Sequence, residues 1–165
     1  MQSSCKFTAP WGQSLKVMTV LVSALLLGVA LFGMFNSRAT DMMWVINVVI
    51  MPPLVLAICA LFTVRGFEVA DGRLLVQRLF WKTPVSLDNL QNVEVNPEAM
   101  KRSIRTFGNG GLFSFTGRFR NKQLGPFRAF AMDPSLSVVL TFPDRVIVVT
   151  PDNPARFADQ LNRML

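Results

Sequence analysis

The sequence contains no histidine and only two cysteines, and these shortages exclude several kinds of catalytic and metal site. Without histidine the chain cannot form a Ser-His-Asp triad or a Cys-His pair. Two cysteines without histidine also make a zinc site improbable, because zinc is held mainly by Cys and His ligands. We expect no disulfide between Cys5 and Cys59, because the first precedes a long apolar stretch and the second lies inside another.

Charged side chains are missing from two long stretches, residues 17–37 and 42–64. About 20 apolar residues cross the bilayer core as a helix, and both stretches meet that length. A pair of buried soluble helices is disfavoured, because such helices rarely stay apolar around their whole circumference. A signal peptide is an alternative for the first stretch, but its apolar run exceeds the usual ~7–15 residues and a second run follows. We therefore expect a transmembrane hairpin with helices at about 17–35 and 43–64.

The connection between the two spans, residues 36–41, is short and polar, so it predicts antiparallel helices with both termini on one side. Cytoplasmic flanks of membrane helices are enriched in Lys and Arg. The connection holds only Arg38 beside Asp41, whereas more basic residues flank the hairpin outside it: Lys6, Lys16, Arg65, Arg73, Arg78 and Lys82. We therefore expect a cytoplasmic N-terminal segment over residues 1–16 and a cytoplasmic domain over residues 65–165.

Residues 65–165 change from long apolar runs to short β-rich runs separated by turn residues. Asp71-Gly72 predicts a two-residue hairpin turn, and Asn109-Gly110 is a further turn signal. The chain ends in ARFADQLNRML, where Asp152 or Asn153 can cap a helix that has Pro154 in its first turn. The pattern predicts about seven antiparallel strands in a partly open barrel and a C-terminal capping helix, a mainly-β, pleckstrin-homology-like (PH-like) architecture.

Three segments resemble the bacterial PH-domain membrane proteins: TPVSLDNLQNVEV, FGNGGLFSFTGRFRNKQLG and VIVVTPDNPARFADQL. The resemblance runs from about residue 69 to the C-terminus and includes the preceding helical hairpin. It implies a PH-like domain anchored in a bacterial inner membrane. Lipid-binding PH domains usually draw their phosphoinositide site from a longer first hairpin loop, whereas here that hairpin closes at Asp71-Gly72 with only Arg73 beside it.

The glycine-rich stretch of residues 105–122 does not match a nucleotide-binding motif. A dinucleotide fingerprint needs G-x-G-x-x-G, but Phe113 stands where the third glycine should be, and the P-loop pattern is missing as well. Gly117 lies within a strand-like run, where glycine indicates a bulge or a close approach of backbones. Phe113, Phe115 and Phe119 share one parity, so a regular strand would place them on one face. We expect no cofactor.

Seven basic residues and no acid lie between Glu98 and Asp133. They form the candidate binding surface, which we call the basic strip: Lys101, Arg102, Arg105, Arg118, Arg120, Lys122 and Arg128. Three interpretations remain open: a solvated face without a ligand, a surface for anionic lipid headgroups, and a docking surface for an acidic protein. Nucleic acid is not expected, because no DNA- or RNA-binding motif accompanies the charge.

The resulting functional hypothesis is a non-catalytic, membrane-anchored binding or scaffolding module. We expect no catalytic residues, because no pair of acids has a spacing that indicates general acid–base chemistry. The alternatives are a membrane-associated enzyme with an unrecognised site and a subunit of a transport or channel assembly. Neither span contains an ionisable residue, which disfavours the latter. Open sheet edges also make a homo-oligomer conceivable.

Overall fold

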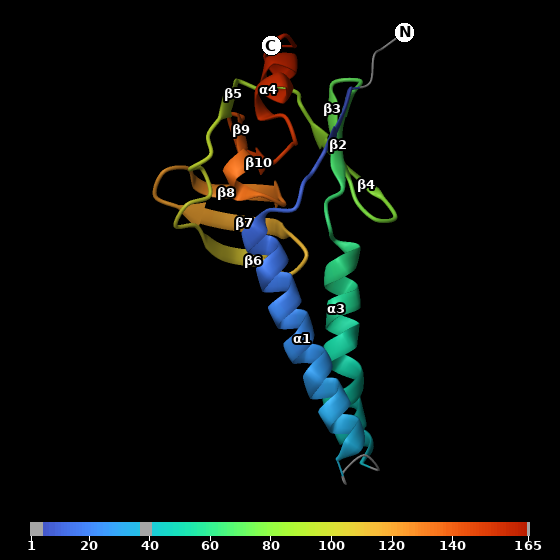
Figure 1. Cartoon of the computed structure of the whole chain (residues 1–165). Coiled ribbons are helices and arrows are strands. Elements are labelled where there is room, and N and C mark those ends of the chain that lie inside the picture. The colour runs from blue at the N-terminus through green and yellow to red at the C-terminus, as the bar shows by residue number, and fades with distance from the viewer. Residues whose placement is uncertain (1–4, 37–40, 165) are drawn as a thin grey trace.

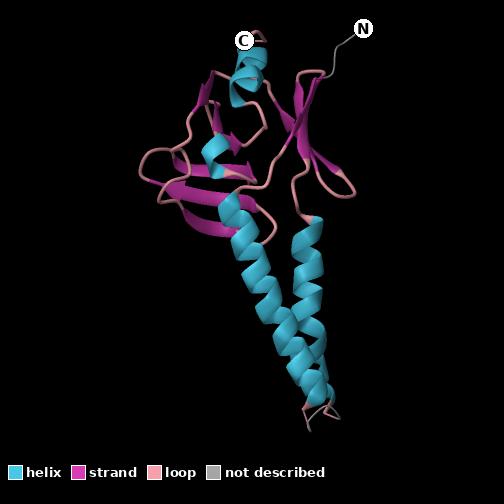
Figure 2. Ribbon diagram, viewed as in Figure 1, coloured by secondary structure: helices cyan, strands magenta, loops and turns pink. Residues whose placement is uncertain are grey.

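The computed structural model describes residues 5–36 and 41–164, and it consists of a helical hairpin joined to a β-rich domain (Figures 1 and 2). Residues 37–40, which contain Arg38 and most of the polar connection, lie outside the described residues, as does Leu165. Two helices in the described part are long and apolar enough to cross a membrane, Gln13–Phe35 and Met42–Leu61. The first begins four residues before the expected position 17, and the second ends three residues before position 64.

The second span is one continuous helical rod made of α2 (Met42–Trp44), the π-helical segment η1 (Val45–Ile50) and α3 (Met51–Leu61). Pro52 and Pro53 follow the π-helical segment and have no backbone N–H, so they remove two helical hydrogen bonds. The Asn47 side-chain amide donates to the Met43 carbonyl of its own helix at 2.8 Å. These polar and proline residues are therefore accommodated within the helix itself, which is their ordinary structural role in membrane spans.

The two spans contact each other closely near their connection and separate toward the β domain. A side chain added at Gly33 of α1 (Gln13–Phe35) would come within 2.7 Å of the Val48 side chain. The indole of Trp44 also donates to the Gly33 carbonyl at 3.2 Å. Figure 1 shows the opposite ends of α1 and α3 farther apart, at the level where each joins the β domain.

The first sheet has the order β1-β2-β3-β4, with all neighbours antiparallel. Its strands are β1 (Cys5–Thr8), β2 (Gly66–Ala70), β3 (Arg73–Gln77) and β4 (Lys82–Ser86). The expected hairpin at Asp71-Gly72 is confirmed, because Ala70 pairs with Arg73 across it. β1 corrects the division made from sequence: residues 5–8, assigned to a separate N-terminal segment, form an edge strand of the β domain.

The second sheet has the order β5-β9-β10-β8-β7-β6. Its strands are β5 (Asn92–Val95), β6 (Ile104–Gly110), β7 (Phe115–Asn121), β8 (Gly125–Ala131), β9 (Val138–Thr141) and β10 (Val146–Val149), with a short 3-10 helix, η2 (Pro134–Leu136), before β9. The sequence predicts about seven antiparallel strands in residues 65–165, whereas the structure has nine in the described part of this range, β2 to β10, and β10 pairs with β8 in parallel.

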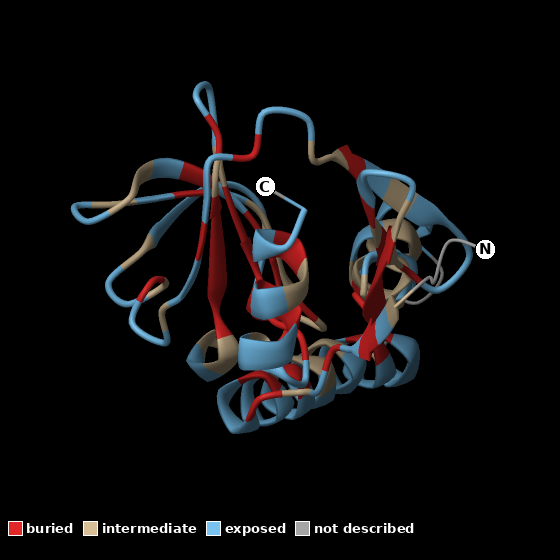
Figure 3. Cartoon of the chain, turned by 90° about the horizontal axis from the view of Figure 1, so that it is seen from above, coloured by how far each residue is buried: buried red, intermediate tan, exposed pale blue. Residues whose placement is uncertain are grey.

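The C-terminal helix α4 (Pro154–Asn162) lies between the two sheets, at the end of the domain away from the hairpin (Figures 1 and 3). Asn153 caps it by accepting from the Arg156 N–H at 3.0 Å. Phe157 and Leu161 are fully buried, and the Phe157 ring packs edge-on against Phe7 of β1 at 5.0 Å. The capping helix predicted from sequence is therefore present, and it closes a core shared by both sheets.

The β domain is attached to both helices by hydrogen bonds. Gly12, at the start of α1, donates to the Met132 carbonyl at 3.2 Å, and Arg65, after α3, donates to the Gln77 carbonyl at 2.8 Å. The Phe113 N–H, in the β6–β7 turn, donates to the Thr19 hydroxyl of α1 at 3.0 Å. The β6–β7 turn therefore lies beside the second turn of α1, one of the two helices that are long and apolar enough to cross a membrane.

Candidate functional site

All seven residues of the basic strip are exposed, and they lie on β6, β7, β8 and the loops next to these strands. Of these seven residues, only Lys101 forms an ion pair with an acid of the described part of the chain, Glu98. The strip does not form one continuous row. Instead, its members divide between two cavities, and a third cavity is lined by Arg118 and Arg128 from one group and Arg120 from the other.

The first group surrounds a cavity of about 870 Å³ between the end of α3 and strands β6 and β7. Three residues of the strip line it, Arg105, Arg118 and Arg128, together with Arg78 from the β3–β4 turn. We call these four residues the arginine pocket. Apolar side chains complete the wall, with Ile58 and Phe62 contributed by α3. No acidic residue lines this cavity.

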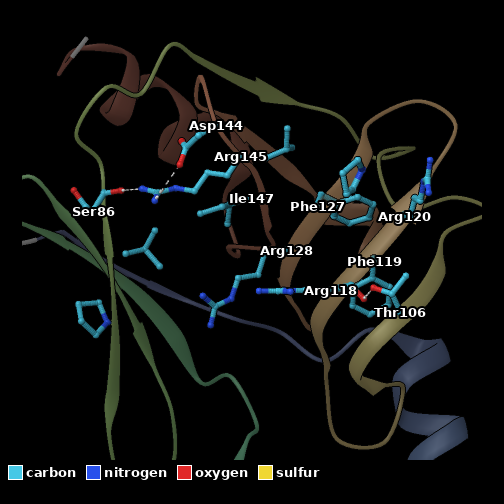
Figure 4. A pocket seen from close by; sticks show the side chains of 14 residues that line it. Ser86, Thr106, Arg118, Phe119, Arg120, Phe127, Arg128, Asp144, Arg145 and Ile147 are labelled. Atoms are coloured by element: carbon cyan, nitrogen blue, oxygen red, sulfur yellow. Dashed lines mark hydrogen bonds and ion pairs between the residues drawn. The ribbon is translucent and has the colours of Figure 1, made fainter.

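Strand register explains why two of these arginines meet. Arg118 of β7 pairs directly with Arg128 of β8, so the two side chains lie opposite each other on one face of the sheet. Figure 4, which draws a neighbouring cavity, shows both side chains in the space between the sheets, with Arg120 farther along β7. The alternate residues Phe119 and Phe127 face the other side, where their rings stack at 5.9 Å. Like charges placed directly opposite in a sheet are destabilising unless something offsets them.

Arg78 is the member of the pocket that sequence reasoning did not include. Only 8% of its surface is exposed, and its guanidinium donates to the Phe62 carbonyl and, at 3.1 Å, to the Thr83 hydroxyl. It also lies over the rings of Phe62 and Phe130, at 5.5 and 5.6 Å from their centres. Burial, with a further contribution from the nearby charge of Arg128, lowers the pKa of Arg78 below its ordinary value. Arginine nevertheless stays protonated, so a charge is held here without an acidic partner among the described residues.

Two glycines of the glycine-rich stretch shape the wall of the pocket. Gly108 of β6 pairs with Gly117 of β7, and both have positive φ, 106° and 145°. A side chain added at Gly117 would come within 2.1 Å of the Phe107 carbonyl oxygen. The close approach of backbones predicted at Gly117 is confirmed. The turn predicted at Asn109-Gly110 is displaced, because both residues belong to β6 and the chain reverses over residues 111–114.

A neighbouring cavity of about 630 Å³ shares Arg118 and Arg128 with the arginine pocket and extends between β4 and β8 (Figure 4). Arg145 closes part of it by donating to the Ser86 carbonyl at 3.1 Å. Arg118 and Arg128 therefore line both this cavity and the arginine pocket. Only the arginine pocket includes residues of a membrane-spanning helix.

The second group of the strip surrounds a separate cavity of about 1180 Å³ near the β7–β8 turn. Its basic members are Lys101, Arg102, Arg120 and Lys122, which we call the outer cluster. Ile104, which is 73% exposed, lies beside them at the start of β6. Because β6 is the last strand of its sheet, the outer cluster borders an open sheet edge.

The three phenylalanines expected on one face of a regular strand do not share one. Phe119 is buried and Phe113 lies in the turn before β7, with its ring edge-on to Trp11 at 6.2 Å, so Phe113, Phe115 and Phe119 do not form one strand face. Within the β domain, the most exposed rings are Phe80 in the β3–β4 turn and Phe107 on β6, each 77% exposed. Both elements also contribute to the arginine pocket.

Groups of three or more His, Cys, Asp or Glu side chains that could hold a metal ion do not occur in residues 5–36 and 41–164. Of the acids, Glu68 is buried and its carboxylate accepts from Lys82 at 2.7 Å, and this bond lowers the pKa of Glu68 despite the opposing effect of burial. That pairing gives Glu68 a structural role within the first sheet. The chemistry that the described site offers is the binding of anions next to apolar surface.

Comparison with known proteins identifies the β domain. The family model described as "Bacterial PH domain" matches residues 65–165, well over half of the chain. No curated protein and no solved structure matches the chain. The matched region contains both sheets except β1, together with α4 and every arginine of the pocket. The chain, with its two long apolar helices before this region, therefore belongs to the bacterial PH domain family.

Proposed function

We propose that the protein is a non-catalytic, membrane-anchored PH-like module that binds anionic lipid headgroups at the cytoplasmic face of a bacterial inner membrane. The observation that carries this proposal is the contact of the β6–β7 turn with α1, which holds β6 and β7 beside that helix, with the outer cluster at the other ends of these strands. The β6–β7 turn is hydrogen-bonded to Thr19, only three residues beyond Lys16. At about 1.5 Å per residue, Thr19 lies roughly 4–5 Å deeper along the helix than that lysine.

The open edge of the second sheet suits contact with headgroups. β6 is the strand of its sheet that lies lowest beside α1 in Figure 1. It carries the exposed apolar side chains of Ile104 and Phe107 and, between them, exposed Arg105. Such a mixture of apolar and basic side chains is typical of segments that lie in the membrane interface.

The outer cluster supplies the electrostatic part of the proposed interaction. A Lys or Arg near an anionic membrane surface contributes about 1 kcal/mol, and this contribution is screened over a Debye length of ~8 Å. Three of the four residues have no acidic partner among the described residues. Their combined contribution is therefore on the order of a few kcal/mol, enough to orient a domain that the hairpin already holds at the membrane.

Hydrogen exchange of the full-length protein in nanodiscs tests the proposal. We expect backbone amides of residues 101–123 to exchange more slowly in discs that contain phosphatidylglycerol than in discs of phosphatidylcholine alone. The slowing should fade as salt is raised. Replacing Arg120 and Lys122 by Glu should remove it, because the outer cluster would then repel the anionic headgroups.

A matched double variant, Arg156→Glu with Arg163→Glu, provides the control. Both residues are exposed near α4, at the end of the domain away from the hairpin (Figure 1). This variant has the same change in net charge and should keep the slowing. Equal exchange in neutral and anionic discs at low salt would contradict the proposal. Slowing that persists at high salt would instead indicate apolar insertion of Ile104 and Phe107.

A further inference from the structure

The arginine pocket concentrates positive charge that the described protein does not neutralise. Arg118 and Arg128 lie directly opposite each other, and neither forms an ion pair with an acid in the described residues. The buried Arg78 lies close enough to Arg128 for their charges to interact. Like charges held together in partly desolvated surroundings are unfavourable, and a bound anion would offset this cost.

The chemistry of the side chains indicates which anion fits. Guanidinium groups present planar forks of N–H donors that match the oxygens of phosphate and carboxylate groups. The pocket has four such groups, and no acid reduces their charge. A terminal phosphate, which carries more than one negative charge near neutral pH, matches this excess better than a phosphodiester with a single charge.

The wall of the pocket opposite the arginines is apolar, and part of it comes from the end of the second apolar helix. Ile58 lies within α3, and Phe62 follows its last residue, with 46% and 43% of their surfaces exposed. Leu112 and Phe107 continue this wall on the β-domain side. The pocket takes lining residues from the C-terminal end of α3, and Figure 1 shows this end of α3 separated from α1. If α3 crosses the bilayer as proposed, these side chains lie next to the acyl chains. A small soluble phosphate would leave this apolar wall uncovered.

We propose that the arginine pocket binds one membrane lipid with a terminal phosphate headgroup, with the phosphate among Arg78, Arg118 and Arg128 and the acyl chains along α3. This inference rests on the proposed function in placing the domain at the headgroup layer, and it adds a defined site for a single lipid. The cavity volume of about 870 Å³ lies within the ~300–1,000 Å³ typical of small-molecule sites.

The test measures lipid adducts on the full-length, delipidated protein in detergent by native mass spectrometry. The probe is dioctanoyl phosphatidic acid, compared with dioctanoyl phosphatidylglycerol, dioctanoyl phosphatidylcholine and inorganic phosphate. We expect a single saturable adduct with phosphatidic acid, weaker binding of phosphatidylglycerol, and the weakest binding of phosphatidylcholine. Inorganic phosphate should compete poorly, because it cannot cover the apolar wall.

Matched variants separate the pocket from the general charge of the domain. Arg118→Gln and Arg128→Gln should each weaken phosphatidic acid binding by about tenfold or more, the usual worth of a hydrogen bond between charged groups. Arg156→Gln is the control, because Arg156 is exposed on α4, at the end of the domain away from the hairpin, and does not line the pocket. Phe107→Ser should weaken phosphatidic acid binding and leave the weak effect of inorganic phosphate unchanged.

Several outcomes would overturn the inference. Equal affinity for phosphatidylcholine and phosphatidic acid would remove the phosphate requirement, and inorganic phosphate that competed as well as the lipid would indicate a soluble ligand. Equal losses in Arg118→Gln and Arg156→Gln would indicate general electrostatic attraction only, which leaves the proposed headgroup contact intact. A dimer that forms in place of the lipid adduct would indicate a second copy of the chain as the occupant. Lipid binding with unchanged hydrogen exchange in nanodiscs would instead contradict the proposed function alone.

Discussion

At the residue scale, the arginine pocket depends on a wall in which two strands approach unusually closely. The carbonyl of Phe107 occupies the space that a side chain at Gly117 would need, and the φ of Gly117 is 145°. L-residues other than glycine rarely adopt such positive φ values, so two separate costs oppose any replacement. Glycine at this position therefore serves the pairing of β6 with β7 and not the binding of a phosphate by a glycine-rich loop.

We predict that Gly117→Ala lowers the stability of the β domain by clearly more than Gly125→Ala. Gly125 also has a positive φ, 69°, but a side chain added there would meet no atom within 4 Å. Gly125→Ala should therefore cost only the conformational term, about 1–2 kcal/mol, whereas Gly117→Ala adds a collision between backbones. Urea unfolding of the full-length protein in detergent measures both values. Equal costs would show that the strands separate easily at this position.

At the element scale, the unexpected strand β1 makes a specific contribution to the core. Phe7 is buried against Phe157 of α4, while its neighbour Lys6 is exposed on the other face of the strand. We predict that Phe7→Ala destabilises the β domain by about 3–5 kcal/mol, the usual cost of removing a buried phenylalanine ring. Lys6→Ala is the control and should change little. The free energy of unfolding in urea measures both, and a negligible effect of Phe7→Ala would show that β1 is dispensable.

The elements differ in how far sequence alone could predict them, and the reasons are physical. The hairpin follows from two charge-free runs, and α4 follows from its cap at Asn153 and its apolar spacing. β1 has only four residues before an apolar helix, too few for a periodic signal. The parallel pairing of β8 with β10 depends on contacts between distant segments. The place of Arg78 in the arginine pocket could not be predicted for the same reason, because this site forms only when the β3–β4 turn meets the end of α3.

At the scale of the whole molecule, the pairing of β1 with β2 bears on the topology in the membrane. These strands immediately flank the hairpin in sequence, and they pair over Cys5–Thr8 and Gly66–Ala70. If the two helices cross a membrane, as proposed, both ends of the hairpin therefore lie on the same side of it, which requires an even number of crossings. This agrees with two spans and with the excess of basic residues outside the connection.

We predict that reporters fused to the N-terminus and after Leu165 both behave as cytoplasmic, and that a reporter inserted after Ser37 behaves as periplasmic. Paired alkaline phosphatase and green fluorescent protein fusions measure this, because the former is active only outside the cytoplasm and the latter fluoresces mainly inside it. Phosphatase activity from the C-terminal fusion would overturn the cytoplasmic assignment, and with it the contact with the inner leaflet.

The strand β1 also has a consequence for how the protein is made. During translation β1 is synthesised first, then the two helices of the hairpin, and only afterwards β2, the strand with which β1 pairs. When both helices cross the membrane, β1 and β2 can pair only after the second crossing has placed β2 on the same side as β1. A chain that stops halfway would expose the unpaired edge of β1 or β2, a feature that favours aggregation. Completion of the first sheet thus excludes a chain in which only one of the two helices has crossed the membrane.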